Sequence, residues 1–191
     1  FLNNLIVFMS DTVGKLNSAS SIAKFMKSQG LYVSTNVILN YMSYFSEAYL
    51  TYPVGRYDLH GKRLLESNDK CYFGDVGLRN HIAGGDRSQD IEKVIENVVF
   101  LHLLRLGYDV KVGQLRAGEI DFVCTKSDSK AYVQVSYIIA NEETYKRELG
   151  NLRLIQEDYP KYVISVSPLI KRSDDNGITH LHLREFLKNG L

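Results

Sequence analysis

The sequence is poor in residue types that define whole classes of protein. It has two cysteines, Cys71 and Cys124, which form neither a Cys-x-x-Cys pair nor a cluster with histidine. This argues against a zinc site and against a disulfide framework, and predicts a reducing, cytoplasmic compartment. Only three prolines occur, and there is no tryptophan, repeat or low-complexity linker. No apolar run approaches the roughly 18 residues that a membrane span needs, so we expect no membrane partner.

The chain also has no large excess of positive or negative charge. Lysine and arginine number 23 against 22 aspartates and glutamates, a formal net charge of +1. Long-range attraction to nucleic acid or acidic substrates is therefore not expected, and any such binding must come from a local patch.

Two common catalytic motifs are missing. There is no Gly-x-x-x-x-Gly-Lys-Ser/Thr loop, because Gly14 and Lys15 are followed by Leu16, and there is no Gly-x-Ser-x-Gly. The first residue is Phe1, from which we expect the chain to be a fragment of a longer protein.

What is present predicts two domains. Of the 191 residues, 45% are apolar, enough for a real core. Helical spacing predicts helices over 2–12, from a cap at Ser20 or Ser21 to Gly30, and from a cap at Ser34 to residue 47. A strand over 48–54 and return strands over 62–65 or 70–73 follow. Three helices and a hairpin are the order of a winged helix-turn-helix, which we assign, with a connector, to residues 1–80.

The second half, residues 81–191, has a different order, and glycines cluster at the boundary near 75–85. A long buried helix comes first, three strands follow, and then a helix, a buried strand, and a last strand with a helix. The fold class is therefore mixed α+β or α/β, with an α-β-β-β-α-β core. The expected ranges, in order, are 91–106, 108–112, 119–124, 131–139, 142–157, 162–166 and 177–187.

One group of polar residues in this core is a candidate catalytic and metal-binding site. Glu96 lies on the long helix, Asp121 on the second strand, and Gln134 and Ser136 on the third. Strand alternation puts residues 119, 121 and 123 on one face and 120, 122 and 124 on the other, while Gln134 and Ser136 share a face. Hard oxygen ligands of this kind suit Mg²⁺, which would neutralise a phosphodiester and activate water.

This arrangement resembles the core of PD-(D/E)XK nucleases, and the whole chain resembles the C-terminal half of a prokaryotic AAA+ ATPase family. The resemblance is carried by segment 70–78, which reads KCYFGDVGL, by Ile95-Glu96-Asn97, and by segment 118–123, which reads GEIDFV. In that family an ATP-binding module precedes a winged helix and a nuclease-like domain of unassigned function. The resemblance implies restriction-endonuclease-like topology and an upstream ATPase module as partner; ATP would act only through that module.

The chain departs from the nuclease pattern where the lysine should be. Gln134 and Ser136 stand where the pattern has Glu-x-Lys, so a carboxylate is replaced by an amide and the ammonium is missing. The expected site is therefore degenerate: Glu96, Asp121, Gln134 and Ser136, of which the first three would bind Mg²⁺ weakly. Lys111 or Lys146 could replace the lysine. Glu96 and Asp121 also have an ordinary explanation, since each could be satisfied by a neighbouring arginine or backbone amide.

DNA contact is a separate question. The expected recognition helix has no lysine or arginine over 34–47, so it supplies no counterion release. Contact with DNA would be led by the hairpin. Tyrosine is abundant, with 13 residues, which suits protein interfaces as well as base stacking. The candidate DNA-binding residues are Lys24, Lys27, Asn36, Asn40, Arg56, Lys62 and Arg63.

We therefore expect a non-catalytic or weakly catalytic effector region of a AAA+-type ATPase that contacts DNA or a partner protein. The alternatives are a Mg²⁺-dependent DNA endonuclease with a relocated lysine, and an oligomerisation module that makes a homo-oligomer.

Overall fold

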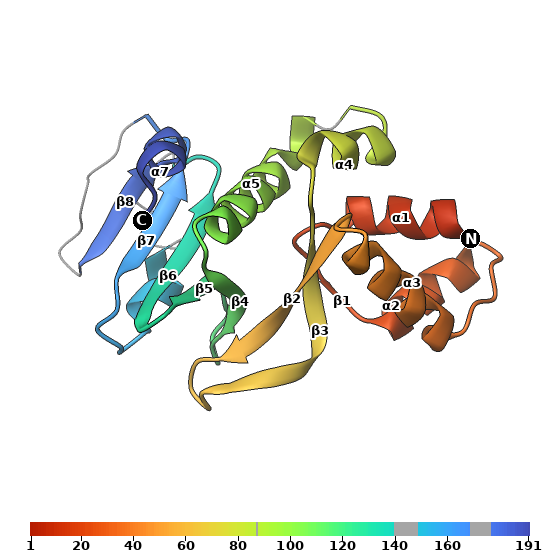
Figure 1. Ribbon diagram of the computed structural model, residues 1–191, viewed down its shortest axis with the longest axis horizontal. Coiled ribbons are helices and arrows are strands. Elements are labelled where there is room, and N and C mark those ends of the chain that lie inside the picture. The colour runs from red at the N-terminus through yellow and green to blue at the C-terminus, as the bar shows by residue number, and fades with distance from the viewer. Residues whose placement is uncertain (87, 140–148, 169–176) are drawn as a thin grey trace.

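The computed structural model describes residues 1–86, 88–139, 149–168 and 177–191, and shows a mixed α/β chain built on one large mixed sheet (Figure 1). Among these residues, no helix is long and apolar enough to cross a membrane. The helices are α1 (Leu2–Asp11), α2 (Ala19–Ser28), α3 (Thr35–Glu47), α4 (Val76–Ala83), the 3₁₀ turn η1 (Ser88–Asp90), α5 (Ile91–Arg105) and α7 (Leu183–Asn189).

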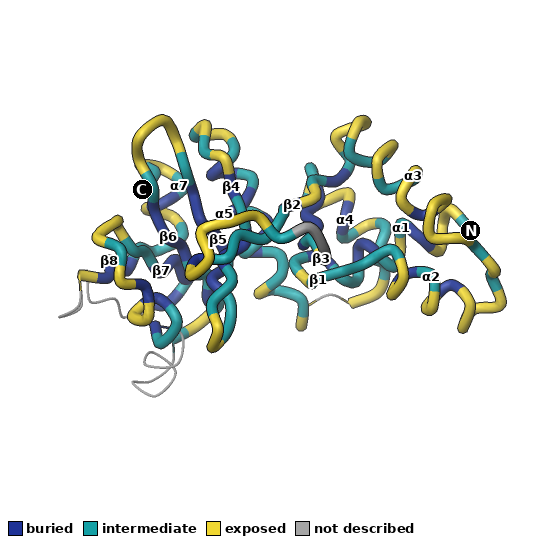
Figure 2. The backbone as a smooth tube through the Cα atoms, turned by 90° about the horizontal axis from the view of Figure 1, so that it is seen from below, coloured by how far each residue is buried: buried dark blue, intermediate teal, exposed yellow. Residues whose placement is uncertain are grey.

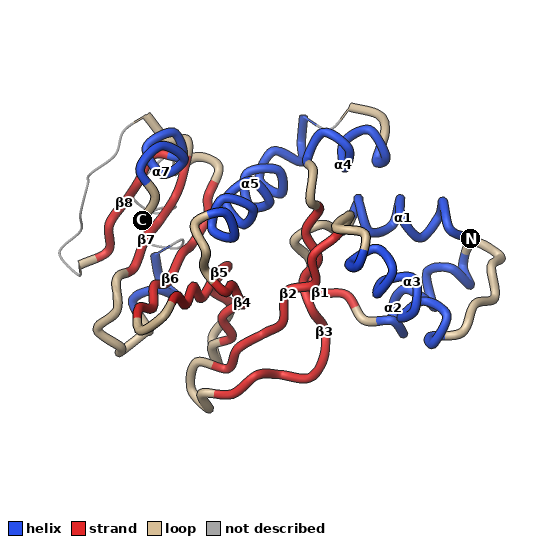
Figure 3. The backbone as a smooth tube through the Cα atoms, in the orientation of Figure 1, coloured by secondary structure: helices blue, strands red, loops and turns tan. Residues whose placement is uncertain are grey.

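In the described part of the chain, eight strands form the sheet in the order β1-β3-β2-β4-β5-β6-β7-β8. Parallel pairs join β2 to β4, β6 to β7 and β7 to β8, and the other neighbours are antiparallel. Figure 3 shows the strands in red. The strands are β1 (Leu16–Asn17), β2 (Thr51–Asp58), β3 (Arg63–Phe73), β4 (Asp109–Gln114), β5 (Glu119–Lys126), β6 (Ser129–Ser136), β7 (Lys161–Ser165) and β8 (Ile178–His182).

The three N-terminal helices confirm the predicted order, with one correction at a cap. α2 begins after Ser18, whose hydroxyl accepts from the Ser21 amide in a capping box, so the predicted cap at Ser20 or Ser21 is wrong. Ser18 is the N-cap because its extended backbone orients the hydroxyl toward the first turn of α2. Ser34 caps α3 as predicted, through its hydroxyl and the Val37 amide.

The hairpin of β2 and β3 is longer than predicted and joins the two halves of the chain. β3 runs through both expected return strands, and β2 continues to Asp58 instead of turning at Gly55. The last residues of β2 pair in parallel with β4, so the sheet crosses the boundary expected near residue 80. The glycine-rich connector expected there contains α4, capped by Asp75, whose carboxylate accepts from the Leu78 amide.

In the described residues of the second half, the long helix α5, the five strands β4 to β8 and the terminal helix α7 confirm the predicted order. Residues 142–148 of the helix expected over 142–157 lie outside the described residues. From residue 149 the chain is helical only to residue 153, so the predicted end at 157 is wrong; Leu149, Leu152 and Ile155 are buried.

The core is shared by both halves. Buried residues of the N-terminal helices and of strands in the second half belong to one hydrophobic cluster. Short buried segments recur along the tube in both halves (Figure 2). At its centre, the ring of Tyr72 on β3 stacks on Phe100 of α5, with centroids 4.6 Å apart, and Phe122 of β5 packs against both. β3 is thereby fixed against the helix and strand that carry the predicted site.

Candidate functional site

Glu96 is placed by the asparagine that follows it. The Asn97 side chain donates to the carbonyl of Phe73 at 2.8 Å and accepts from the Phe73 amide at 2.9 Å, so it pairs with the end of β3 as another strand would. Both partners are buried, and a buried backbone polar group must be satisfied. This pair of hydrogen bonds docks α5 on β3 and brings Glu96 beside Lys70 and Tyr72.

Asp121 lies at a β-bulge. Lys111 of β4 pairs with Val123 and Gly113 pairs with Ile120, so two residues of β5 face one of β4. The bulge changes the phase of alternation: Ile120 packs in the same cluster as Val123, whereas Phe122 packs in the other. The predicted shared face of Ile120 and Phe122 is therefore wrong.

Asp121 and Gln134 exchange hydrogen bonds with each other's strands. Asp121 Oδ2 accepts from the Val135 amide at 2.8 Å, and Gln134 Oε1 accepts from the Asp121 amide at 3.4 Å. The β5–β6 ladder ends at Phe122 and Val133, so these side chains continue the pairing where the backbone does not. Part of their role is thus structural.

The four residues of the predicted site line one hollow. It has a volume of about 180 Å³ and contains Glu96, Asp121, Gln134 and Ser136, together with Glu92, Val135 and Tyr137. The topology therefore brings together the residues that the sequence singled out.

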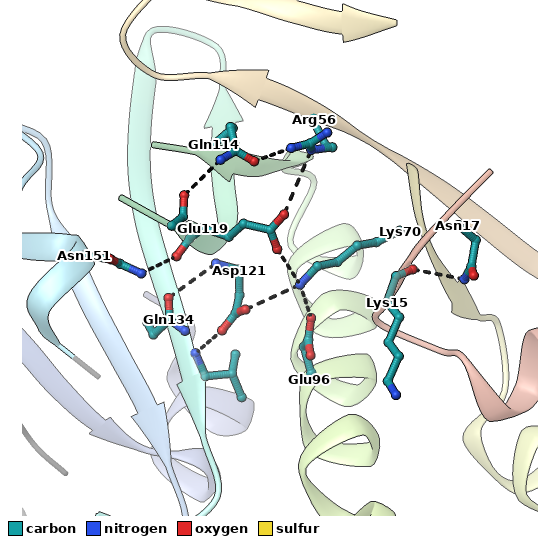
Figure 4. A network of polar contacts seen from close by, with 12 residues as sticks. Lys15, Asn17, Arg56, Lys70, Glu96, Gln114, Glu119, Asp121, Gln134 and Asn151 are labelled. Carbon is teal, nitrogen blue, oxygen red and sulfur yellow. Dashed lines mark hydrogen bonds and ion pairs between the residues drawn. The ribbon is translucent and has the colours of Figure 1, made fainter. Parts of the chain in front are cut away.

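Lys70 is the residue that sequence reasoning missed. It follows an irregular stretch of β3: Leu65 pairs with Arg56 and Lys70 pairs with Val54, so four residues of β3 face Gly55 alone. Asn68, within that stretch, has a left-handed backbone at φ 63°. When the register resumes, the Lys70 side chain points into the acidic group (Figure 4).

The Lys70 ammonium contacts three carboxylates. Its Nζ lies 3.1 Å from Glu96 Oε1, 3.6 Å from Asp121 Oδ1 and 3.9 Å from Glu119 Oε2. The side chain is only 8% exposed. Burial lowers the pKa of Lys70, but the three carboxylates outweigh it, so the pKa lies above its ordinary value and the ammonium stays charged.

Tyr72 and Gly14 complete the surroundings of Glu96. The Tyr72 hydroxyl donates to Glu96 Oε1 at 2.5 Å, and burial together with Glu96 raises the pKa of the phenol well above its ordinary value. Gly14 has φ 72°, and a Cβ built there would lie 3.0 Å from Glu96 Oε2. The Gly-Lys pair that superficially resembles a phosphate loop thus has a structural reason: glycine adopts this positive φ without strain, and a larger residue would crowd Glu96.

Glu119 connects the site to Arg56. Arg56 Nε lies 4.0 Å from Glu119 Oε1, and Arg56 Nη2 donates to Gln114 Oε1. Three carboxylates and the two cations Lys70 and Arg56 therefore leave a formal charge of about −1 in this network.

These residues do not fit Mg²⁺ as they are arranged. Of the four carboxylate oxygens of Glu96 and Asp121, three already face Lys70, Tyr72 or the Val135 amide. The third predicted ligand, Gln134, is neutral, and Mg²⁺ needs oxygens at about 2.1 Å in near-octahedral geometry. In the described part of the chain, no three His, Cys, Asp or Glu side chains are placed to hold a metal ion.

The expected substitutes for the missing lysine are not placed in the site. Lys111 Nζ pairs with Asp109 at 2.8 Å on β4, and it is not among the residues lining the hollow. Lys146 lies outside the described residues.

The candidate DNA-binding residues form two groups, one on helices α2 and α3 and one on the β2–β3 hairpin. Four are exposed on the helices, with Lys24 and Lys27 on α2 and Asn36 and Asn40 on α3. The hairpin residues lie elsewhere, because the end of β2 pairs with the end of β4 in the second half.

The three candidate cations of the hairpin differ in how exposed their side chains are. Lys62 and Arg63 are 69% and 76% exposed. Arg56 is 16% exposed and engaged with Gln114 and Glu119, so it belongs to the acidic network.

Comparisons with known proteins give relatives without assigned functions. Residues 2–89 match the model of a domain of unknown function, DUF8612. An uncharacterized protein of Haemophilus influenzae is 36% identical over 186 residues, covering 97% of this chain and 45% of that protein. Uncharacterized protein MJ1544 of Methanocaldococcus jannaschii is 29% identical over 136 residues, covering 69% of this chain and 29% of that protein. The chain thus spans less than half the length of these curated relatives.

Among solved structures, the crystal structure of protein VC1899 from Vibrio cholerae aligns with 99% of this chain and 50% of that one. The TM-score is 0.36 and the sequence identity 13%, too low to assign a shared fold.

Proposed function

We propose that this chain is a non-catalytic, nuclease-like effector region of a longer AAA+-type ATPase, and that it acts by contact rather than by cleavage. A winged helix and a restriction-endonuclease-like core are part of this proposal. It is supported by the α-β-β-β order that brings Glu96, Asp121 and Gln134 to one hollow, and by the greater length of the curated relatives.

One observation carries the non-catalytic assignment: three of the four carboxylate oxygens of Glu96 and Asp121 already face donors of the chain. A phosphodiester hydrolase must supply a cation to the scissile phosphate and an activated water. Here the nearest ammonium is buried against carboxylates, and Ser136, where the pattern has lysine, carries no charge.

The exposed surface of α3 suits contact with a protein better than contact with DNA. α3 has no lysine or arginine, and its exposed surface includes Val37, Leu39 and Tyr44. Apolar and aromatic side chains without cations suit a protein surface, whereas DNA contact draws its affinity from released counterions.

The proposal is tested with supercoiled plasmid, Mg²⁺ or Mn²⁺, and the chain with and without Asp121→Asn. We expect no nicking by either protein. Metal-dependent nicking by the unmodified chain that Asp121→Asn abolishes would refute the non-catalytic assignment.

Contact with DNA is tested by the fluorescence anisotropy of a labelled duplex at low salt. We expect weak binding that Lys62→Ala with Arg63→Ala removes and that a matched change on α3, Asn36→Ala with Asn40→Ala, leaves unchanged. Tight binding that depends on the α3 asparagines would instead identify α3 as a DNA-reading helix.

The second candidate is an endonuclease with a relocated lysine. It is favoured by one specific observation, the Lys70 ammonium beside Glu96 and Asp121. The nicking experiment separates the two candidates directly.

A further inference from the structure

We propose that Lys70 is the resident cation of the acidic site: its ammonium lies among Glu96, Asp121 and Glu119, where a divalent cation held by these three groups would lie, and it neutralises the carboxylates that face the hollow, so that the site does not hold a metal ion. This inference rests on the proposed function, because it gives the reason why a nuclease-like site would not hold its metal.

The first step is the position of the ammonium. Lys70 Nζ contacts carboxylates from two different elements, Glu96 on α5 and Asp121 on β5, and approaches Glu119 on the same strand (Figure 4). A divalent ion bound by these three groups would have to occupy the space in which the ammonium lies. The two cations therefore exclude each other.

The second step is burial. Lys70 is 8% exposed and is not among the residues that line the hollow, whereas Glu96 and Asp121 are. A lysine that orients an attacking water must reach the substrate side of the carboxylates. Lys70 lies behind them, which fits a charge-neutralising residue better than a catalytic one.

The third step is that the surroundings are built to retain the ammonium. Tyr72 donates to the same oxygen of Glu96 that Lys70 contacts, and Arg56 approaches the far oxygen of Glu119. Lys70 itself is paired with Val54 of β2 and with Leu16 of β1, so strands on both sides hold its backbone. Moving the ammonium out would require displacing the strand or leaving three carboxylates facing each other.

A consequence is that the site belongs to both halves of the chain. Glu96, Asp121 and Glu119 come from the region expected to be nuclease-like, and Lys70 comes from the hairpin of the other region. The charge of the site therefore depends on the hairpin's position against α5.

The experiment measures Mn²⁺ binding by titration calorimetry and by the electron paramagnetic resonance of free Mn²⁺, using the 191-residue chain. The variants are Lys70→Met, which keeps the stem and removes the charge, and Lys111→Met, an exposed lysine that also pairs with one carboxylate. We expect no stoichiometric Mn²⁺ site in the unmodified chain or in Lys111→Met. Lys70→Met should bind one Mn²⁺ at least about tenfold more tightly, since the formal charge changes from about −1 to about −2.

Asp121→Asn added to Lys70→Met should abolish that Mn²⁺ binding. Mn²⁺ should also raise the unfolding midpoint of Lys70→Met and not that of the other proteins. If Lys70→Met folds by circular dichroism and binds no Mn²⁺, the inference is wrong.

If Lys70→Met does not fold, Mn²⁺ binding by the unmodified chain tests the inference. One Mn²⁺ bound to the unmodified chain and lost in Asp121→Asn overturns the inference, and the lack of such a site supports it. These results are separate from the test of the proposed function, which metal-dependent nicking of DNA would refute. If the unmodified chain does not nick DNA and Lys70→Met does not bind Mn²⁺, only the role of Lys70 is overturned.

Discussion

Replacing Lys70 with methionine should destabilise the fold far more than the same replacement at Lys111. Both lysines make a short ion pair, at 3.1 Å for Lys70 with Glu96 and 2.8 Å for Lys111 with Asp109. They differ in burial, with side-chain exposures of 8% and 31%. The comparison thus isolates the effect of surroundings from the effect of distance.

The magnitude follows from the contacts. At an effective dielectric of about 20, each carboxylate within 4 Å of the Lys70 ammonium contributes about 4 to 5 kcal/mol of attraction. Most of this offsets the desolvation of the buried charges. Removing one partner of such a pair leaves the others uncompensated, and we expect a loss of about 3 to 5 kcal/mol in the free energy of unfolding. For the exposed Lys111 pair, less than about 1 kcal/mol is expected.

Urea denaturation of the two variants and of the unmodified chain measures both parts of this prediction. Equal losses in the free energy of unfolding for Lys70→Met and Lys111→Met would contradict it.

Two further predictions concern hydrogen bonds to the carboxylates of Glu96 and Glu157. Tyr72→Phe keeps the ring stacked on Phe100 and removes the donor to Glu96, so the free energy of unfolding should fall by about 1.5 to 3 kcal/mol in urea denaturation; an unchanged value would contradict the buried hydrogen bond. Hydrogen bonds from Lys130 and Tyr132 lower the pKa of Glu157 from 4.5 to about 2, so its contribution is present above pH 4.5 and is lost as the pH falls toward 2. Glu157→Gln should therefore lose about 1 to 2 kcal/mol at pH 7 and little near pH 2, and the same loss at both would contradict the assignment.

Much of the fold could be predicted because it depends on local periodicity. Helical spacing and a capping serine located α3, and β-branched runs located β7. The length of β3 could not be predicted, because its two regular parts are separated by an irregular stretch facing Gly55, which breaks the alternation used to recognise a strand.

The candidate site was predicted in part for the same reason. Glu96, Asp121 and Gln134 come from regular elements in a recognisable order, and the structure places them at one hollow. Lys70 comes from a strand outside that order. It begins segment 70–78, which carries the family resemblance, but nothing in that segment indicates that the lysine side chain contacts Glu96. Only the register between β3 and β2 directs it toward Glu96, and register between distant segments is a property of tertiary packing.

Anomalous diffraction from crystals of the unmodified chain grown in Mn²⁺ would show whether a metal ion binds at the acidic site. We expect no anomalous peak between Glu96 and Asp121, and we expect the Lys70 ammonium in contact with both carboxylates. A Mn²⁺ peak within coordination distance of those carboxylates would contradict the role proposed for Lys70.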